Sequence, residues 1–132
     1  MKSVRQFVFF WIVLALLANP APAKQRRRQQ AWGVPVVYSN LDLEPETGDV
    51  GGMEVILIPT YYGDWASVVV ASGIAYDPVL VPVERNGAQI TFTLPNSPPY
   101  DGYGTFKGTI TRKGLVLRNE NLGTQVLARQ RC

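Results

Sequence analysis

The sequence predicts an all-β protein, a small antiparallel up-and-down barrel or a sandwich of seven to eight strands, from three observations. After residue 23, no stretch of ten or more residues keeps the apolar spacing of a helix without an interrupting Gly or Pro. Eight prolines and twelve glycines divide this region into short runs rich in Val, Ile, Thr, Tyr and Phe. Turn signals recur about every ten residues, which is typical of small barrels and sandwiches.

Four expected strands occupy the first half of this region. The polar, Gly-rich segment Asn40–Gly52 and the turn Tyr61–Asp64 connect them. Pro82 lies inside the fourth run and has no backbone donor, so that strand is expected at a sheet edge or a bulge. The four strands are Val34–Tyr38, Met53–Thr60, Trp65–Gly73 and Val79–Glu84.

Alternation of apolar and polar residues defines the second half. Asn86-Gly87 is the clearest turn signal, because both residues tolerate the positive φ of a type I′ hairpin. In Gln89–Leu94, apolar residues alternate with threonines, which predicts one face in a core and one in water. Consecutive hairpins favour up-and-down connectivity, and closure into a barrel removes exposed strand edges. The later strands are Thr105–Thr111, Leu115–Arg118 and Thr124–Arg129, after the loop Pro95–Gly104.

The C-terminal section resembles the late hairpins of small secreted lipocalin- and avidin-like barrels. It reads F-x-G-x-I over Phe106–Ile110, then G-L at Gly114-Leu115, then L-x-R over Leu127–Arg129. The chain departs from lipocalins at Ala31-Trp32-Gly33, where the order of their G-x-W motif is reversed. The resemblance implies a barrel with an interior ligand site, and it transfers no binding residue.

Residues 1–23 have the layout of a secretory signal peptide. Basic residues precede the apolar run Phe7–Ala18, and Ala21-Pro22-Ala23 supplies an A-x-A cleavage site. The run is shorter than the roughly 20 residues of a membrane-spanning helix. We expect cleavage after Ala23, a secreted or periplasmic protein, a basic flexible tail over 24–33 and one all-β domain over 34–132. Positive charge just after the cleavage site opposes translocation, so an uncleaved anchor is the alternative.

Charge is segregated along the exported chain. Ala31–Glu84 carries eight acidic residues and no Lys or Arg, whereas Arg85–Cys132 carries seven basic and two acidic residues. Either the two halves neutralise each other in the fold, or they leave a dipolar surface that steers a charged partner. The net charge near zero after cleavage argues against nucleic acid as a partner. Weak contact with anionic surfaces is expected of Arg26, Arg27 and Arg28.

Most enzyme chemistries lack their residues here, so we expect no enzyme, no cofactor and no metal. The chain has no His, which excludes a Ser-His-Asp triad and an imidazole zinc site. A catalytic carboxylate pair stays formally open. The acidic run Asp42–Asp49 lacks the EF-hand spacing and is interpreted as a solvated loop. Cys132 is the single cysteine, so no internal disulfide is expected, and its thiol is free, bridged to another chain or inert.

Five aromatic residues at or beside turns are the candidate binding residues. Loops on a rigid β scaffold are common binding positions, and Tyr and Trp are enriched in binding hot spots. If all five lie at one barrel end, they form a single patch flanked by Asp64 and Asp101. The alternative is that their rings stabilise hairpins and cover the barrel ends. The candidates are Tyr61, Tyr62, Trp65, Tyr100 and Tyr103.

Two kinds of partner follow from these features. A small exported module docks an unknown protein through its aromatic loops, or it carries a small apolar ligand in the barrel interior. Small barrels often fill their interior with side chains, which favours protein docking. An empty apolar interior above about 300 Å³ would favour the ligand carrier.

Overall fold

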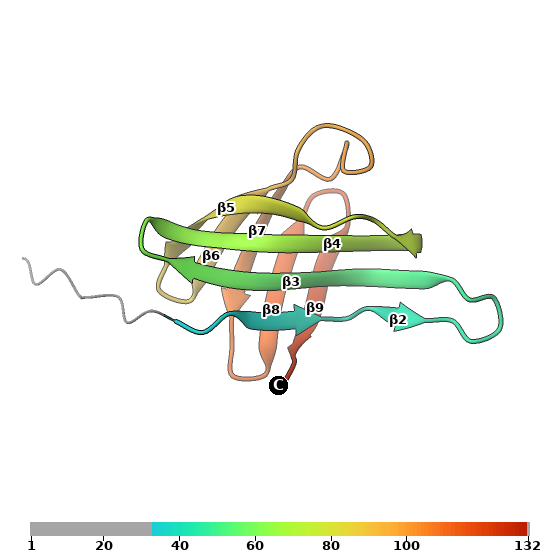
Figure 1. Ribbon diagram of the computed structural model, residues 1–132, viewed down its shortest axis with the longest axis horizontal. Helices are drawn as coiled ribbons and strands as arrows, with labels where there is room; N and C mark the ends of the chain where they lie inside the picture. The colour runs from blue at the N-terminus through green and yellow to red at the C-terminus, as the bar shows by residue number, and fades with distance from the viewer. Residues whose placement is uncertain (1–32, 132) are drawn as a thin grey trace, which may run out of the picture.

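The computed structural model describes residues 33–131, which form a closed antiparallel β-barrel of eight strands with one extra strand (Figure 1). The all-β up-and-down barrel prediction is confirmed, and the sandwich alternative is not what forms. The strands are β1 (Val36–Ser39), β2 (Asp42–Leu43), β3 (Val50–Thr60), β4 (Gly63–Ala75), β5 (Val79–Asn86), β6 (Gln89–Thr93), β7 (Thr105–Ile110), β8 (Gly114–Asn119) and β9 (Gly123–Arg129).

The barrel closes through β1, which pairs on both sides. Strands β3 to β9 pair in chain order, and β1 then joins β9 back to β3. Val36 lies opposite Leu57 of β3, and Tyr38 lies opposite both Val55 of β3 and Arg129 of β9. Closure gives the central strands partners on both sides and leaves few free edges.

The hairpin of β3 and β4 is the longest element of the fold. All eleven residues of β3 pair with β4, and the far part of this hairpin extends past the other strands (Figure 1). The two-residue strand β2 pairs with this part, with Leu43 opposite Val50. Residues 40–52 were expected as a connection only, and the structure corrects this with β2 and the start of β3.

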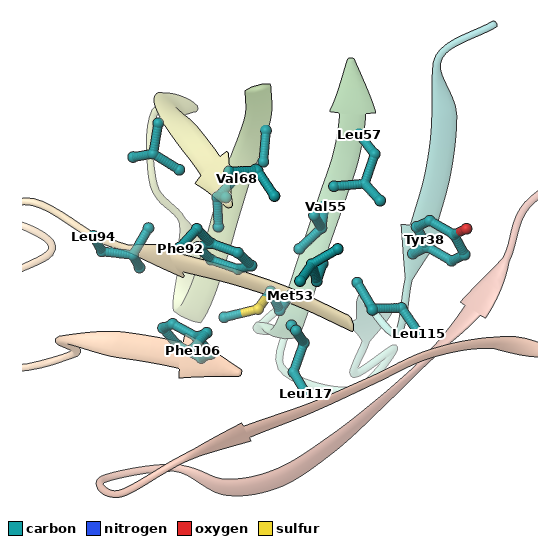
Figure 2. Close-up of a cluster of buried hydrophobic side chains, with 14 of the residues drawn as sticks. Tyr38, Met53, Val55, Leu57, Val68, Phe92, Leu94, Phe106, Leu115 and Leu117 are labelled. Carbon is teal, nitrogen blue, oxygen red and sulfur yellow. The ribbon is translucent and has the colours of Figure 1, made fainter. Parts of the chain in front are cut away.

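The barrel interior is packed with apolar side chains, as Figure 2 shows. Strand alternation places Ile90, Phe92 and Leu94 inside, as the sequence predicts, each at 3% exposure or less. The Phe92 and Phe106 rings stack with centroids 5.3 Å apart. At Gly108 a Cβ atom would lie 2.7 Å from Leu117 Cδ2 and 2.9 Å from Ile90 Cγ1, so the interior has no room for a methyl group there.

Up-and-down connectivity sorts the connections between the two ends of the barrel. The β3–β4, β5–β6 and β7–β8 turns lie at one end, which we call the Tyr61 end. The β4–β5, β6–β7 and β8–β9 connections lie at the other, which we call the Tyr100 end. This follows because consecutive antiparallel strands run in opposite directions.

The β5–β6 turn differs from the expected type I′ turn. Asn86 pairs with Gln89, so the two turn residues are Gly87 and Ala88. Gly87 has φ 61°, and within residues 33–131 no residue other than glycine has positive φ. Positive φ at the first turn residue alone is the pattern of type II′, which requires Gly there. The positive φ predicted at Gly87 is confirmed, and the type I′ assignment was wrong.

Pro82 lies in a part of β5 that pairs with β4 but not with β6. Residues 79–83 of β5 pair with β4, whereas only residues 84–86 pair with β6. Pro82 lies opposite Trp65 of β4 in the one-sided stretch, where a missing backbone donor costs no ladder bond on the β6 side. The strand is edge-like at Pro82, as predicted, although β5 as a whole lies between two neighbours.

Gly87→Val is expected to lower the free energy of unfolding by about 1 kcal/mol or more, because a β-branched residue resists positive φ. Urea denaturation measures the effect. Ala88→Val is the control, since Ala88 has no positive φ and its variant should lose much less. Equal stability of both variants would contradict the turn assignment.

Candidate functional site

Tyr61 and Tyr62 form the tip of the β3–β4 hairpin. Their side chains are 73% and 94% exposed, and their rings meet edge to face with centroids 5.1 Å apart. Thr60 holds the turn, because its hydroxyl donates to the Gly63 carbonyl at 2.6 Å and accepts from the Tyr62 amide at 3.3 Å. Two aromatic rings are therefore presented to solvent on a defined turn.

An apolar face continues from this tip along the outside of the barrel. Trp65 points outward at 37% exposure because the next residue, Ala66, is fully buried on the inner face. In the ladder Trp65 lies between Ile58 of β3 and Pro82 of β5, and the next row brings Ile56 and Leu80. We call this the Trp65 face, defined by Ile56, Ile58, Trp65, Leu80 and Pro82.

Tyr100 belongs to the core rather than to a surface. Its side chain is 4% exposed, and its hydroxyl donates to the Val68 carbonyl at 3.3 Å and to the Asp77 carbonyl. Burial raises the pKa of Tyr100 above its usual value of 10.0, and the Asp77 charge adds to this. The ring of Tyr103, half-buried, packs 6.4 Å from that of Tyr100. Burial also raises the pKa of Tyr103, with a contribution from Tyr76.

The five aromatic candidates therefore do not make one patch. Tyr61, Tyr62 and Trp65 lie at and beside the Tyr61 end, whereas Tyr100 and Tyr103 hold the β6–β7 loop at the opposite end. The second pair closes the barrel end, as the alternative interpretation of the rings expected. Of the five candidates, only Tyr61, Tyr62 and Trp65 have side chains that are classed as exposed.

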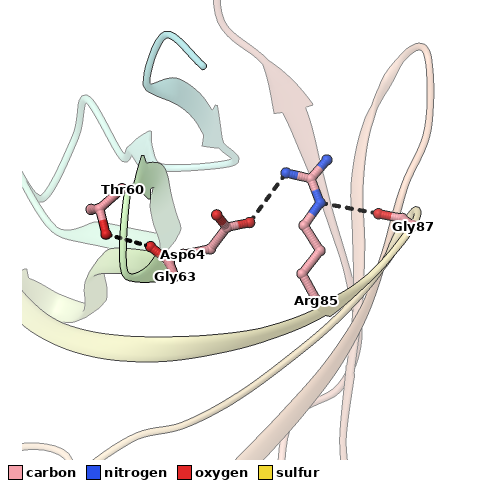
Figure 3. A network of polar contacts seen from close by, with 5 residues as sticks. All are labelled: Thr60, Gly63, Asp64, Arg85 and Gly87. Carbon is pink, nitrogen blue, oxygen red and sulfur yellow. Dashed lines mark hydrogen bonds and ion pairs between the residues drawn. The ribbon is translucent and has the colours of Figure 1, made fainter. Parts of the chain in front are cut away.

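Asp64 lies inside the barrel mouth at the Tyr61 end (Figure 3). It alternates with the inward residues Ala66 and Val68, and its side chain is 6% exposed. Its Oδ2 pairs with Arg85 Nη1 at 3.3 Å, and Arg85 Nε donates to the Gly87 carbonyl at 3.0 Å. Asp64 Oδ1 is buried and has no hydrogen-bond partner among the described residues. Asp64 thus ties β4 to the β5–β6 hairpin and does not flank an aromatic patch.

A groove of about 1160 Å³ lies on the outer face of β7 and β8, on a different part of the barrel from the Trp65 face. Sequence reasoning missed it, although the alternation that buries Phe106 and Leu117 also places polar residues outside. The polar side chains in the groove lining include Gln89, Thr105, Lys107, Thr109, Arg118 and Thr124.

No metal site or membrane-spanning helix is found within residues 33–131. His, Cys, Asp and Glu do not gather there in groups of three or more that could hold a metal ion. The structure assigns no helix in that range, so none there is long and apolar enough to cross a membrane. The acidic residues of Asp42–Asp49 are exposed around β2 and its connection to β3.

Comparisons with protein-family models, with curated protein sequences and with solved structures found no match to this chain. The resemblance to lipocalin- and avidin-like barrels therefore stays a sequence-based prediction. The signal peptide predicted for residues 1–23, the basic residues Arg26–Arg28 and the thiol of Cys132 lie outside the described residues.

Proposed function

We propose that this protein is an exported, non-enzymatic β-barrel module that docks a protein partner through the Tyr61–Tyr62 tip and the Trp65 face. The observation that carries the proposal is the 94% exposure of Tyr62 beside a second exposed tyrosine, continuous with an outward Trp. Exposed aromatic rings add little to the stability of the fold, because they bury little apolar surface. Tyr and Trp are, however, enriched among the residues that dominate binding energy.

The charge of the surrounding strands indicates the chemistry of the partner. The chain from Ala31 to Glu84, which includes β3 and β4, carries only acidic charges. Glu54 lies on the outer side of β3 in the row after Ile56. An apolar partner surface with a basic rim is complementary to this face, and opposite charges would also speed the encounter.

The packed interior argues against the alternative, a carrier of a small apolar ligand. Side chains with no exposure, including Phe106, Leu115 and Leu127, occupy the space such a ligand would need. At Gly108 even one added carbon would meet its neighbours. Ligand pockets are usually about 300–1,000 Å³, which a filled eight-stranded barrel does not offer.

The test uses the full chain exported by its host. A photo-crosslinking residue in place of Tyr62 identifies the partner, and the purified partner is then titrated against wild type, Tyr62→Ala and Trp65→Ala. We expect at least one truncation to cost about 2 kcal/mol of binding, roughly thirtyfold in Kd. Unfolding of Tyr62→Ala should change by no more than about 0.5 kcal/mol, because the side chain is exposed.

Leu122→Ala is the matched control. Leu122 is 38% exposed, close to the 37% of Trp65, but it lies in the β8–β9 turn at the Tyr100 end. Its truncation should leave binding unchanged. Equal weakening by Leu122→Ala, or unchanged binding in both aromatic variants, would refute docking at this face.

A further inference from the structure

Two cationic side chains face each other on the floor of the outer groove. Lys107 of β7 lies directly opposite Arg118 of β8 in the ladder, and both side chains point outward because Phe106 and Leu117 point inward. Like charges directly opposite each other on neighbouring strands destabilise a sheet. The Lys107–Arg118 pair therefore lowers the stability of the fold when no ligand is bound.

No counter-ion within residues 33–131 relieves this repulsion. The structure gives neither Lys107 nor Arg118 an ion pair or a side-chain hydrogen bond. Glu120 also lines the groove, but it forms no ion pair with either cation. Glu84, the carboxylate in the same ladder row, is separated from Lys107 by Thr91 of β6. Strands lie about 4.8 Å apart, so Glu84 is roughly 10 Å from Lys107.

Neutral hydrogen-bonding groups surround the two cations. Thr105, Thr109 and Thr124 contribute hydroxyl groups to the lining. The Thr109 hydroxyl donates to Gln89 Oε1 at 3.1 Å, and this bond does not use the two amide hydrogens of Gln89. A run of hydroxyl and amide groups beside a positive pair matches a ligand that carries both hydroxyls and an acidic group.

One end of the groove is held in place by a buried side chain. Asn119 Nδ2 donates to the Tyr103 and Thr105 carbonyls at 2.6 and 2.9 Å, and Asn119 Oδ1 accepts from the Asn121 and Leu122 amides. The β6–β7 loop and the β8–β9 turn are thereby tied together as the groove wall. A wall fixed before binding lowers the ordering cost of binding.

We propose that this groove binds an acidic oligosaccharide, with the sulfate or carboxylate group between Lys107 and Arg118. The threonines and Gln89 would bond to sugar hydroxyls. The groove volume exceeds what a single inorganic anion needs and suits a ligand of several sugar units.

The lining favours an acidic sugar over a nucleic acid. Single-stranded nucleic acids are held by several aromatic stacking platforms along a basic track. Here Tyr103 is the one aromatic residue in the described lining, so a row of stacking platforms for bases is missing. The groove and the Trp65 face occupy different strands, so the two binding proposals stand or fall separately.

The experiment titrates the full chain with four probes of matched length: sulfated dextran oligosaccharide, oligogalacturonate, neutral dextran and oligothymidylate. Lys107→Thr/Arg118→Thr is compared with Arg112→Thr/Lys113→Thr. The second variant removes the same charge from the β7–β8 turn, outside the groove lining. The basic residues Lys24, Arg26, Arg27 and Arg28 are present in all variants, so they cannot produce a difference between them.

We expect the sulfated or the carboxylated sugar to bind the wild type. Its affinity should fall at least tenfold in Lys107→Thr/Arg118→Thr, the groove variant. The affinity should change less than twofold in Arg112→Thr/Lys113→Thr, the turn variant. Without ligand, the groove variant should melt at a higher temperature than wild type, because the like-charge pair is gone. Single Arg118→Gln serves in its place if the double variant does not fold.

Three results would overturn the proposal. One is the absence of binding by either acidic sugar. Another is equal loss in the groove and turn variants, which would mean non-specific attraction. The last is oligothymidylate binding as tight as that of the acidic sugars with the same dependence on Lys107 and Arg118, which would assign the groove to nucleic acid.

Discussion

Phe106→Ala is expected to lower the free energy of unfolding by about 3–5 kcal/mol, the range for truncating a buried Phe. Phe106 has no exposed surface and stacks on Phe92 with an angle of 13° between the rings. Its removal loses the transfer free energy of the ring and leaves a cavity that the closed barrel cannot collapse to fill. Because a domain of this size is typically stable by only 5–15 kcal/mol, the variant should be close to unfolding at 37 °C.

Urea denaturation followed by fluorescence measures this loss. Tyr62→Ala removes an aromatic ring of similar size from a site that is 94% exposed, and it should change stability by less than about 0.5 kcal/mol. Phe106→Leu should lie between the two, since most of the volume remains. Similar midpoints for Phe106→Ala and Tyr62→Ala would refute the packed interior and reopen the case for a ligand inside the barrel.

Gly114→Ala is expected to lower the free energy of unfolding by about 3 kcal/mol, at the upper end of the range for overpacking. A Cβ at Gly114 would lie 2.0 Å from the Leu127 carbonyl oxygen and 3.0 Å from the Leu127 carbonyl carbon. These are backbone atoms, so no side-chain rotation relieves the contact. The strands β8 and β9 must separate where Gly114 faces Ala128, next to the point where β9 meets β1.

Gly51→Ala is the control for Gly114→Ala. Gly51 also lies in a ladder, opposite Ser72, but a Cβ there would meet no atom within 4 Å and its φ is not positive. The free energy of unfolding of Gly51→Ala should lie within about 0.5 kcal/mol of the wild-type value. If both alanine variants have the same urea midpoint, the close approach of β8 and β9 at Gly114 is refuted.

Side-chain alternation was the part of the fold most accessible to prediction. Ile90, Phe92 and Leu94 alternate with threonines, and this period of two assigned both the strand and its buried face. The same alternation, extended by two residues before Ala66 and Val68, places Asp64 inside. It was assigned to a turn instead because Asp is common in turns and depleted in strands.

The candidate site shows where local patterns stop being informative. Tyr62 and Tyr100 both lie in tyrosine-rich segments beside Gly and Asp, yet one is 94% exposed and the other 4%. Tyr100 is buried because Tyr76 and the carbonyls of Val68 and Asp77 lie against it, and these come from 23 or more residues away. A contact with such remote partners leaves no periodic signal near Tyr100 itself.

The sequence by itself determined the strand-rich composition, the places where the chain turns and the residues that face inward, because these depend on interactions among near neighbours. Tertiary structure alone decided that β1 closes the ring between β9 and β3, that the two tyrosine groups lie at opposite ends, and that Lys107 meets Arg118 on one face. Closure depends on pairing between strands far apart in the chain, the placing of the tyrosine groups depends on the connectivity of the closed sheet, and the Lys107–Arg118 pair depends on the exact register of the β7–β8 hairpin, which packing of the interior selects.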